Sequence, residues 1–326
     1  MNTTLAVVVA VALGLTLGFF ALHAATAPPV PQLRDTVAGR RITAFLAAFN
    51  SGQETELRHF LLAERGKLSL SDPLIRYLPD YPNPEVAKKV TLEQLANHSS
   101  GLGDIFTERF PSLREKLTSL PAYLPLFADK PLEFEPGARS SYSNAGYVVL
   151  GLVIERVSGA DYYTYVRQNI FTPAQMKDTD SYALAEATQN RAIGYTSGDP
   201  DRPKAGARRP NQDRLPARGS SAGGGYSTAG DLARFAKALA EDRLVGPAWT
   251  RWVVGGPQPK AGAAAPAKGA LPPIDIGAAG GSPGLNAVLE IEGGGEKWTV
   301  VVLSNYDPPS AQKVSRRILT ILGRIQ

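Results

Sequence analysis

"FEPGARSSYSNAGYVVLGLVIERVSGADYYTYVRQNIFTPAQM", residues 134 to 176, is the stretch that decides the fold. Within it, Ala145 to Val157 is apolar on nearly every side, which predicts a helix buried all round. The dipeptide "SG" ends this helix, and Asp161 opens the next one. A tyrosine and an asparagine, Tyr142 and Asn144, stand directly before the apolar run. This pair is the sharpest chemical signal in the chain.

The composition is that of an ordinary globular protein. The chain has 326 residues, of which 43% are hydrophobic and 20% charged, enough for one large domain or two small ones. The absence of cysteine excludes disulfides and thiolate metal sites. The net charge is +5, and the basic stretch 201–218 carries Pro and Gly without interleaved aromatics, so we expect a solvated loop and no nucleic-acid partner. The histidines, His23, His59 and His98, are too scattered to predict a metal site, and nothing implies a cofactor.

The N-terminal 27 residues predict export. Residues 5 to 22 are uncharged and apolar, and "HAATA", residues 23 to 27, offers small residues suited to signal-peptidase cleavage. The apolar run is also close to membrane-spanning length. Residues 1–27 are therefore predicted to be a signal peptide or an uncleaved membrane anchor, and both alternatives stay open. Either one places the body of the protein in the periplasm or outside the cell, with the membrane as a partner if the segment is uncleaved.

The rest of the chain favours an α+β fold. Residues 28–62 form a helical prefix, in which apolar residues recur at helical spacing over 36–49. Residues 255–273 are Ala, Gly and Pro, which is typical of a loop. "LNAVLEIE" (285–292) and "KWTVVVLSN" (297–305) are two strands joined by "GGG", which predicts an antiparallel hairpin after a series of helices.

Five stretches in order carry a family resemblance. They are "GKLSLSDPLIRYLPDYP" (66–82), "TLEQLANHSSGLGD" (91–104), the stretch 134–176, "SSAGGGYSTAGDLARFAKAL" (220–239) and "AAGGSPGLNAVLEI…VVVLSNYDPP" (278–309). From about residue 65 to 326 the chain resembles the β-lactamase-related serine hydrolases, which comprise class C β-lactamases, D-Ala-D-Ala carboxypeptidases and related esterases. The resemblance implies a β-lactamase/DD-peptidase-like domain over 63–326, with an antiparallel sheet flanked by helices and a helical subdomain.

The resemblance also implies site residues. Members of this family transfer acyl groups with the serine of a Ser-x-x-Lys motif, and the tyrosine of a Tyr-x-Asn motif assists proton transfer. Tyr142 is then the base, and Asn144 the clamp for the substrate amide. Gly280 and Gly281 match the substrate-binding strand, where Gly281 offers a backbone oxyanion donor. His98 stands in the family's "THTSGL" element, where a loop hydrogen bond is expected.

Two family features have no match. Counting back from Gly66 by the family's spacing leads to Ser51, which is followed by Glu54 where the motif needs Lys. Gly52 makes that segment a poor helix interior, so no nucleophile stands at the family position and Ser51 is a weak candidate. Ala278 occupies the place of the strand's Lys or His. The nucleophile helix and the two N-terminal strands of the family are also expected to be missing, as in a truncated domain.

Other serines are poor substitutes. The only literal Ser-x-x-Lys is Ser310 to Lys313, which we predict to be a helix N-cap followed by a surface lysine. Ser99, Ser220 and Ser221 lie beside matched motifs, but none has a Lys three residues on.

The sequence therefore predicts a serine hydrolase by descent, acting on amides or esters of peptidoglycan-peptide or β-lactam type, with impaired catalysis. Loss of the nucleophile lowers turnover about a million-fold. Three alternatives stay open: an exported non-catalytic module that binds a small peptide or acyl-type ligand or another partner, an active hydrolase that uses Ser51, and a deletion product of a longer gene.

Overall fold

The computed structural model describes residues 7–10, 62–63, 65–188, 190–197, 208–253, 276–292 and 298–323. Several predicted features lie outside these ranges: the 36–49 helix and nearly all of the 28–62 prefix, Ser51 with Glu54, the 255–273 loop and the glycines 293–295. These features stay predictions.

The described elements are mostly short helices up to residue 253, followed by the run of strands β4, β5 and β6 and a last helix. The α-helices are α3 (Pro84–Lys89), α4 (Leu92–Ala96), α5 (Phe110–Leu113), α6 (Asn144–Ser158), α7 (Tyr162–Val166), α8 (Ala229–Ala240), α9 (Pro247–Val253) and α10 (Ser310–Leu322). Other helical turns are η1 (Leu74–Arg76), η2 (Arg114–Lys116), η3 (Pro121–Leu126), η4 (Arg167–Phe171) and η5 (Gln212–Arg214). The strands are β1 (Val7–Ala10), β2 (Tyr195–Thr196), β3 (Arg209–Pro210), β4 (Ile276–Ser282), β5 (Leu285–Glu292) and β6 (Trp298–Ser304).

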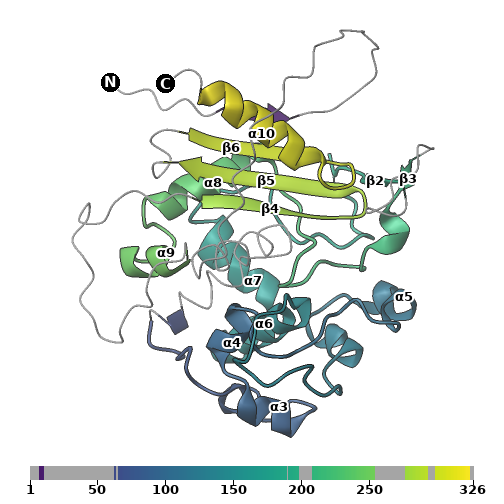
Figure 1. Cartoon of the computed structure of the whole chain (residues 1–326), viewed down its shortest axis with the longest axis vertical. Coiled ribbons are helices and arrows are strands. Elements are labelled where there is room, and N and C mark those ends of the chain that lie inside the picture. Colours follow the sequence, from purple (N-terminus) through teal and green to yellow (C-terminus); the bar gives the residue numbers. More distant parts are fainter. Residues whose placement is uncertain are drawn as a thin grey trace.

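The main sheet has the order β1-β6-β5-β4. Strands β4, β5 and β6 are antiparallel, which confirms the predicted hairpin. Helix α10 covers one face, where Val288, Val300 and Val302 pack, and the opposite face buries Leu289 and Val301 in the main core (Figure 1). Strand β6 is apolar without a break from Val300 to Leu303, as expected of a strand with both faces covered, whereas β5 carries polar side chains at Asn286, Glu290 and Glu292. The α+β prediction, a sheet flanked by helices with a separate helical part, is confirmed.

A strand from the N-terminal region joins this sheet, whereas the sequence predicted none. Strand β1 lies inside the 5–22 apolar run and pairs in parallel with residues 300–303 of β6. A valine-rich run suits a strand beside another apolar strand as well as it suits an apolar helix. The assignment of residues 1–27 as signal or anchor stays a prediction. Within the described ranges, no helix combines the length and the apolar character needed to cross a membrane.

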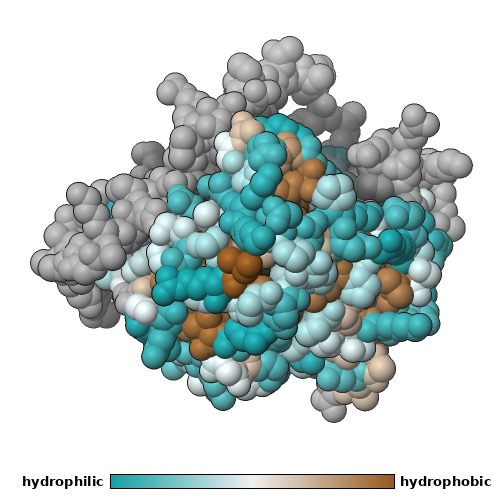
Figure 2. Space-filling model, turned by 90° about the horizontal axis from the view of Figure 1, so that it is seen from below, coloured by the Kyte–Doolittle hydropathy of each residue, from teal (hydrophilic) through white to brown (hydrophobic). Residues whose placement is uncertain are grey.

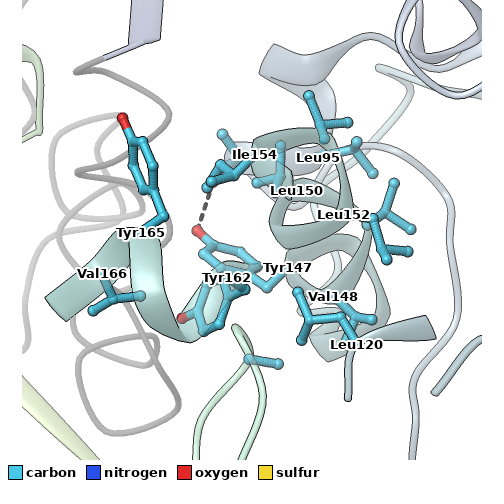
Figure 3. Packing of buried hydrophobic residues seen from close by; sticks show 14 of the residues in the cluster. Leu95, Leu120, Tyr147, Val148, Leu150, Leu152, Ile154, Tyr162, Tyr165 and Val166 are labelled. Carbon is cyan, nitrogen blue, oxygen red and sulfur yellow. Dashed lines mark hydrogen bonds between the residues drawn. The ribbon is translucent and has the colours of Figure 1, made fainter. Parts of the chain in front are cut away.

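Helix α6 is the centre of the helical half. It was predicted over 145–157 and runs from Asn144 to Ser158, and each of its first eleven residues is buried. Figure 3 shows how its side chains meet those of α4, of α7 and of Leu120, the residue before η3. The labelled residues are Leu95, Leu120, Tyr147, Val148, Leu150, Leu152, Ile154, Tyr162, Tyr165 and Val166. This all-round burial gives the start of α6 a rigid base.

The outer surface of this half is mostly polar. Figure 2 shows the face seen from below, where hydrophobic residues form small separate patches. Isolated apolar residues of this kind are normal on protein surfaces.

Candidate active site

The predicted Tyr-x-Asn pair lies at the N-terminus of α6. Ser143 is the N-cap residue: its Oγ accepts the N–H of Gly146 at 3.1 Å and donates to the carbonyl oxygen of Gly103 at 2.6 Å. Serine at this position supplies an acceptor to a helical N–H that has no partner within the helix. The Tyr142 hydroxyl donates to Asn144 Oδ1 at 3.1 Å. The structure therefore joins the two predicted site residues directly.

The loop of residues 97–104 holds this turn in place. The Ser143 N–H donates to His98 Nδ1 at 3.2 Å. Asp104 Oδ2 accepts two hydrogen bonds from Asn144, one from the backbone N–H at 3.0 Å and one from the side-chain Nδ2 at 2.8 Å. A carboxylate is also stabilised at a helix N-terminus by the helix dipole. The loop thus acts as a template for the turn that carries the site.

His98 is buried beneath the pair. Its ring lies 4.6 Å from the Tyr142 ring and 4.9 Å from the Tyr147 ring. Its backbone takes a positive φ of 58°, and Gly101, three residues later, takes a positive φ of 80°. The predicted loop hydrogen bond is confirmed as the acceptance of the Ser143 N–H, which only the neutral ring can make. Burial lowers the pKa of His98 to about 4.

We expect the stability of the fold to fall on acidification because of His98. In the unfolded chain its pKa returns to about 6.5, so between pH 6.5 and pH 4 the unfolded state binds a proton that the folded state does not. This linkage lowers the free energy of unfolding by about 2 kcal/mol between pH 7 and pH 5. Urea unfolding of the wild type and His98→Asn at both pH values measures the effect. Asparagine tolerates positive φ and retains an acceptor, while His23 and His59 stay in both proteins. An equal pH dependence in the two proteins would show that His98 is not responsible.

The second half of the candidate site is β4. Gly280 and Gly281 lie near its end, and a two-residue turn after Ser282 leads back into β5 at Leu285. Because hydrogen-bonded and non-hydrogen-bonded pairs alternate along an antiparallel ladder, the pairing of Ser282 with Leu285 turns the Gly281 N–H away from β5. In the described sheet that side of β4 is the open edge, and Figure 1 shows it drawn toward the helical half. Ala278 lies in the same strand, three residues before Gly281.

Two side chains hold the β4–β5 turn. Asn211 is almost fully buried, and its Nδ2 donates to the carbonyl oxygen of Pro283 at 2.8 Å. Asp307 Oδ1 accepts the N–H of Gly284 at 2.7 Å. Hydrogen bonds to this carboxylate outweigh its partial burial and lower the pKa of Asp307, which therefore stays ionised at neutral pH. The turn that positions Gly281 is thus tied to two other segments.

Comparison with known proteins identifies the family. The family model described as Beta-lactamase matches residues 60–323. The chain belongs to the β-lactamase family.

Relatives and solved structures agree with this assignment. An uncharacterized protein of Mycobacterium tuberculosis (strain CDC 1551 / Oshkosh) is 30% identical over 235 residues, 65% of this chain and 58% of the relative. Penicillin-binding protein 4* of Bacillus subtilis (strain 168) is 34% identical over 147 residues, 43% of this chain and 32% of the relative. A crystal structure of a penicillin-binding protein from Bacillus halodurans is similar with a TM-score of 0.69 and 29% identity, over 83% of this chain and 85% of that one. A D-amino acid amidase from Ochrobactrum anthropi SV3 shares the fold, with a TM-score of 0.65 and 23% identity over 88% and 84%.

This β-lactamase-family chain spans only part of its curated relatives, 58% of the M. tuberculosis protein and 32% of the B. subtilis protein. The family model establishes the family, and the likeness to a solved penicillin-binding protein supports the fold. The activity of the chain is a matter for proposal.

The literal Ser-x-x-Lys is remote from the Tyr-x-Asn turn. Ser310 and Lys313 lie in the first turn of α10, which packs on the far face of the sheet from the main core (Figure 1). The N-cap residue is Pro309, so the prediction that Ser310 caps the helix is wrong. The N–H of Ala311 is instead accepted by Asn286 Oδ1 at 2.7 Å. Asn286, on the neighbouring strand β5, therefore caps the helix in place of the local serine.

The other serines have structural partners. Ser99 Oγ donates to Asn97 Oδ1 at 2.5 Å. Ser220 and Ser221 are buried in the turn before α8, and Ser221 lies where a Cβ on Gly151 of α6 would be placed. None of these three serines is presented as a nucleophile.

Sequence reasoning missed Asp104, Asn211 and Asp307. Asp104 closes the matched stretch 91–104, and its position directly after two turn glycines was the available signal. Its partner Asn144 is forty residues away in the chain, so no local pattern links the two.

Proposed function

We propose that this chain is a β-lactamase-family serine hydrolase by descent that binds small peptide or acyl-type ligands at Tyr142 and Asn144 while acyl transfer is impaired. One observation supports the proposal: Tyr142 is hydrogen-bonded to Asn144, and Asp104 anchors Asn144. The reacting half is absent from the sequence, which has no Ser-x-x-Lys at the family position.

The chemistry follows from these groups. An amide N–H of Asn144 and the outward N–H of Gly281 are donors suited to a ligand carbonyl. Without a serine beside a basic amine, a bound carbonyl meets no activated nucleophile. With Ala278 in place of the strand's cation, charge that develops on a substrate also loses a stabilising partner. Binding without an acyl-enzyme is the expected behaviour.

Covalent labelling tests this proposal. We expect no adduct when the purified protein is incubated with a fluorescent penicillin or a fluorophosphonate, read by gel fluorescence and intact mass, because loss of the nucleophile lowers turnover about a million-fold. Ser51→Ala and Ser310→Ala are run in parallel. Labelling that disappears only in Ser51→Ala would overturn the proposal that acyl transfer is impaired, and it would support an active hydrolase with a non-standard nucleophile.

Binding is measured by calorimetry with a peptide ending in D-Ala-D-Ala. Asn144→Ala should weaken binding about tenfold, the effect of one hydrogen bond with a partner left unsatisfied. Asn169→Ala is the matched control, since Asn169 lies on η4, outside the turn, and its Nδ2 donates to the carbonyl oxygen of Tyr165 on α7. Folded protein that binds no such ligand favours the non-catalytic interaction module, and a broad, non-cooperative melt favours the deletion product.

We also propose that the chain acts outside the cytoplasm, because of the apolar run and small residues in 1–27. N-terminal sequencing of the protein from membrane and soluble fractions decides between a cleaved signal and an anchor, and recovery of the intact chain in the cytosol alone would contradict export.

A further inference from the structure

We propose that a pocket beside the β4–β5 turn is a second binding site of this chain, which takes a small organic carboxylate with a compact apolar body. The pocket has a volume of about 160 Å³ and is lined by residues of the segments 184–188, 191–194 and 211–215, by Tyr226 and by Leu285. None of its lining residues belongs to the Tyr-x-Asn turn. The inference therefore goes beyond the proposed function, and each can fail without the other.

Contacts within the protein hold the walls of the pocket. The N–H of Asn211 donates to the carbonyl oxygen of Gly194 at 3.0 Å, and Asn211 Nδ2 donates to Pro283 in the β4–β5 turn. Gly194 fits closely here, because a Cβ on it would lie 2.5 Å from Asn211 Nδ2 and 2.6 Å from the carbonyl oxygen of Gly284. Figure 1 shows β2 and β3, which adjoin Gly194 and Asn211 in the chain, at the end of the sheet where β4 turns into β5. The pocket is thus built by the fold itself and needs no ligand to form.

Arg191 brings a positive charge to this pocket. Its guanidinium donates to the carbonyl oxygens of Ala183 at 2.8 Å and of Leu184 at 2.9 Å, and it lies 5.6 Å from the centroid of the Tyr226 ring. These partners fix the direction of the group, but none of them carries a formal charge. Among the described residues, no Asp or Glu forms an ion pair with Arg191. A guanidinium has more N–H donors than these two carbonyl oxygens use, so a ligand can accept from the others.

The lining does not compensate the charge of Arg191. Among the described lining residues there is no Asp or Glu, and the other polar ones are Thr188, Asn211, Gln212 and Tyr226. Burial raises the pKa of Tyr226, against a smaller opposite effect of Arg191, so the phenol carries no charge at neutral pH. Glu186, the acidic residue closest to Arg191 in the sequence, accepts a backbone N–H, that of Ala183. The pocket therefore favours an anion, and a carboxylate matches the planar fork of an arginine with two parallel hydrogen bonds.

The apolar part of the lining sets the size of the ligand. Its bulky aliphatic side chains are Leu184, Ile193, Leu215 and Leu285. An apolar cavity of about 150 Å³ takes one benzene molecule. The pocket, at about 160 Å³, therefore has room for one aromatic ring or a branched aliphatic group of that size. The ligand class is a small aromatic or branched aliphatic monocarboxylate.

Benzoate is the probe for this class, and benzamide is its neutral analogue of the same size. In titrations followed by ¹⁵N–¹H NMR at constant ionic strength, benzoate should bind about tenfold more tightly than benzamide. It should exceed acetate, which has the charge without the ring, by a similar factor, and the shifted resonances should include Gly194. Three results would overturn the proposal: no binding of benzoate at millimolar concentration, equal binding of benzoate and benzamide, or equal binding of benzoate, acetate and inorganic phosphate.

Two variants locate the probe. Arg191→Gln removes the charge and should weaken benzoate binding about tenfold while benzamide binding changes little. Ala192→Phe, at an exposed lining residue, fills the pocket and should abolish the binding of both probes. The matched control is Arg156→Gln, which removes the same charge from an exposed ion pair with Asp80. Unchanged benzoate binding in either pocket variant, with the protein folded, would show that benzoate binds elsewhere and overturn the site.

The same titration separates this site from the Tyr-x-Asn turn. Asn144→Ala should bind benzoate as the wild type does, because Asn144 does not line the pocket. Loss of benzoate binding in Asn144→Ala would place the probe at the turn and overturn the second site. Failure of the D-Ala-D-Ala peptide to bind, with benzoate bound as expected, would count against the proposed function alone.

Discussion

Gly101→Ala should lower the free energy of unfolding by about 3–5 kcal/mol, the sum of left-handed backbone strain and a steric overlap that no rotamer relieves. Gly101 has φ of +80°, and a Cβ there would lie 2.2 Å from the carbonyl oxygen of Phe134. The clashing atom belongs to the backbone, so the loop 97–104 must move away from Phe134. That loop holds the Tyr-x-Asn turn, and ligand binding should weaken together with stability.

Gly66→Ala is the matched control for this prediction. Gly66 has φ of +66°, yet a Cβ there meets no atom within 4 Å. Gly66→Ala should lower the free energy of unfolding by about 1–2 kcal/mol, the effect of the backbone strain alone. Urea unfolding of both variants separates the two contributions. If the two alanine variants lost equal stability, the close approach of Gly101 to Phe134 would be unimportant.

Gly151→Ala should destabilise the fold by about 1–3 kcal/mol, although alanine is favoured over glycine in a helix interior. A Cβ on Gly151 would lie 2.4 Å from Ser221 Oγ, 2.7 Å from Ser221 Cβ and 2.5 Å from Leu120 Cδ1. Ser221 and Leu120 are fully buried and cannot swing into solvent. The added methyl group would push helix α6 away from the turn before α8, and the Tyr-x-Asn turn at the N-terminus of α6 would move with the helix.

Gly146→Ala tests the same helix without the clash. A Cβ on Gly146 would have its nearest neighbour, the Leu95 carbonyl oxygen, at 3.5 Å, an ordinary contact. Helix propensity then dominates, and this variant should be neutral or more stable by up to about 1 kcal/mol. Opposite signs for the two substitutions, measured by thermal and urea unfolding, are the expected result; stabilisation by Gly151→Ala would contradict the packing at Ser221.

Elements that depend on neighbouring residues were predictable from sequence. The pattern Thr91-x-x-Gln94 is the sequence signature of a capping box, and the box forms at the start of α4 because both of its hydrogen bonds span only three residues. Helix α6 ends where "SG" predicted, with Gly159 in the left-handed conformation. The motif also identified Tyr142 and Asn144, which differ by two positions and meet in the structure.

Features that depend on distant segments were not predictable. The cap of α10 comes from Asn286 on β5 and not from the adjacent Ser310. The folded sheet places the Asn286 acceptor beside the start of α10, and nothing in the local sequence of α10 indicates this contact. The valines of 7–10 pair with β6, since an apolar run alone does not distinguish a strand from a helix.

The site divides along the same line. The local structure at the start of α6 follows from the local sequence. The helix begins at the capping side chain of Ser143, and Tyr142 and Asn144 lie on either side of that residue. The direction of the Asn144 amide is set by a carboxylate forty residues earlier in the chain, that of Asp104. Hydrogen-bond polarity is a property of the assembled network, since each amide or hydroxyl takes the orientation that its partners leave open.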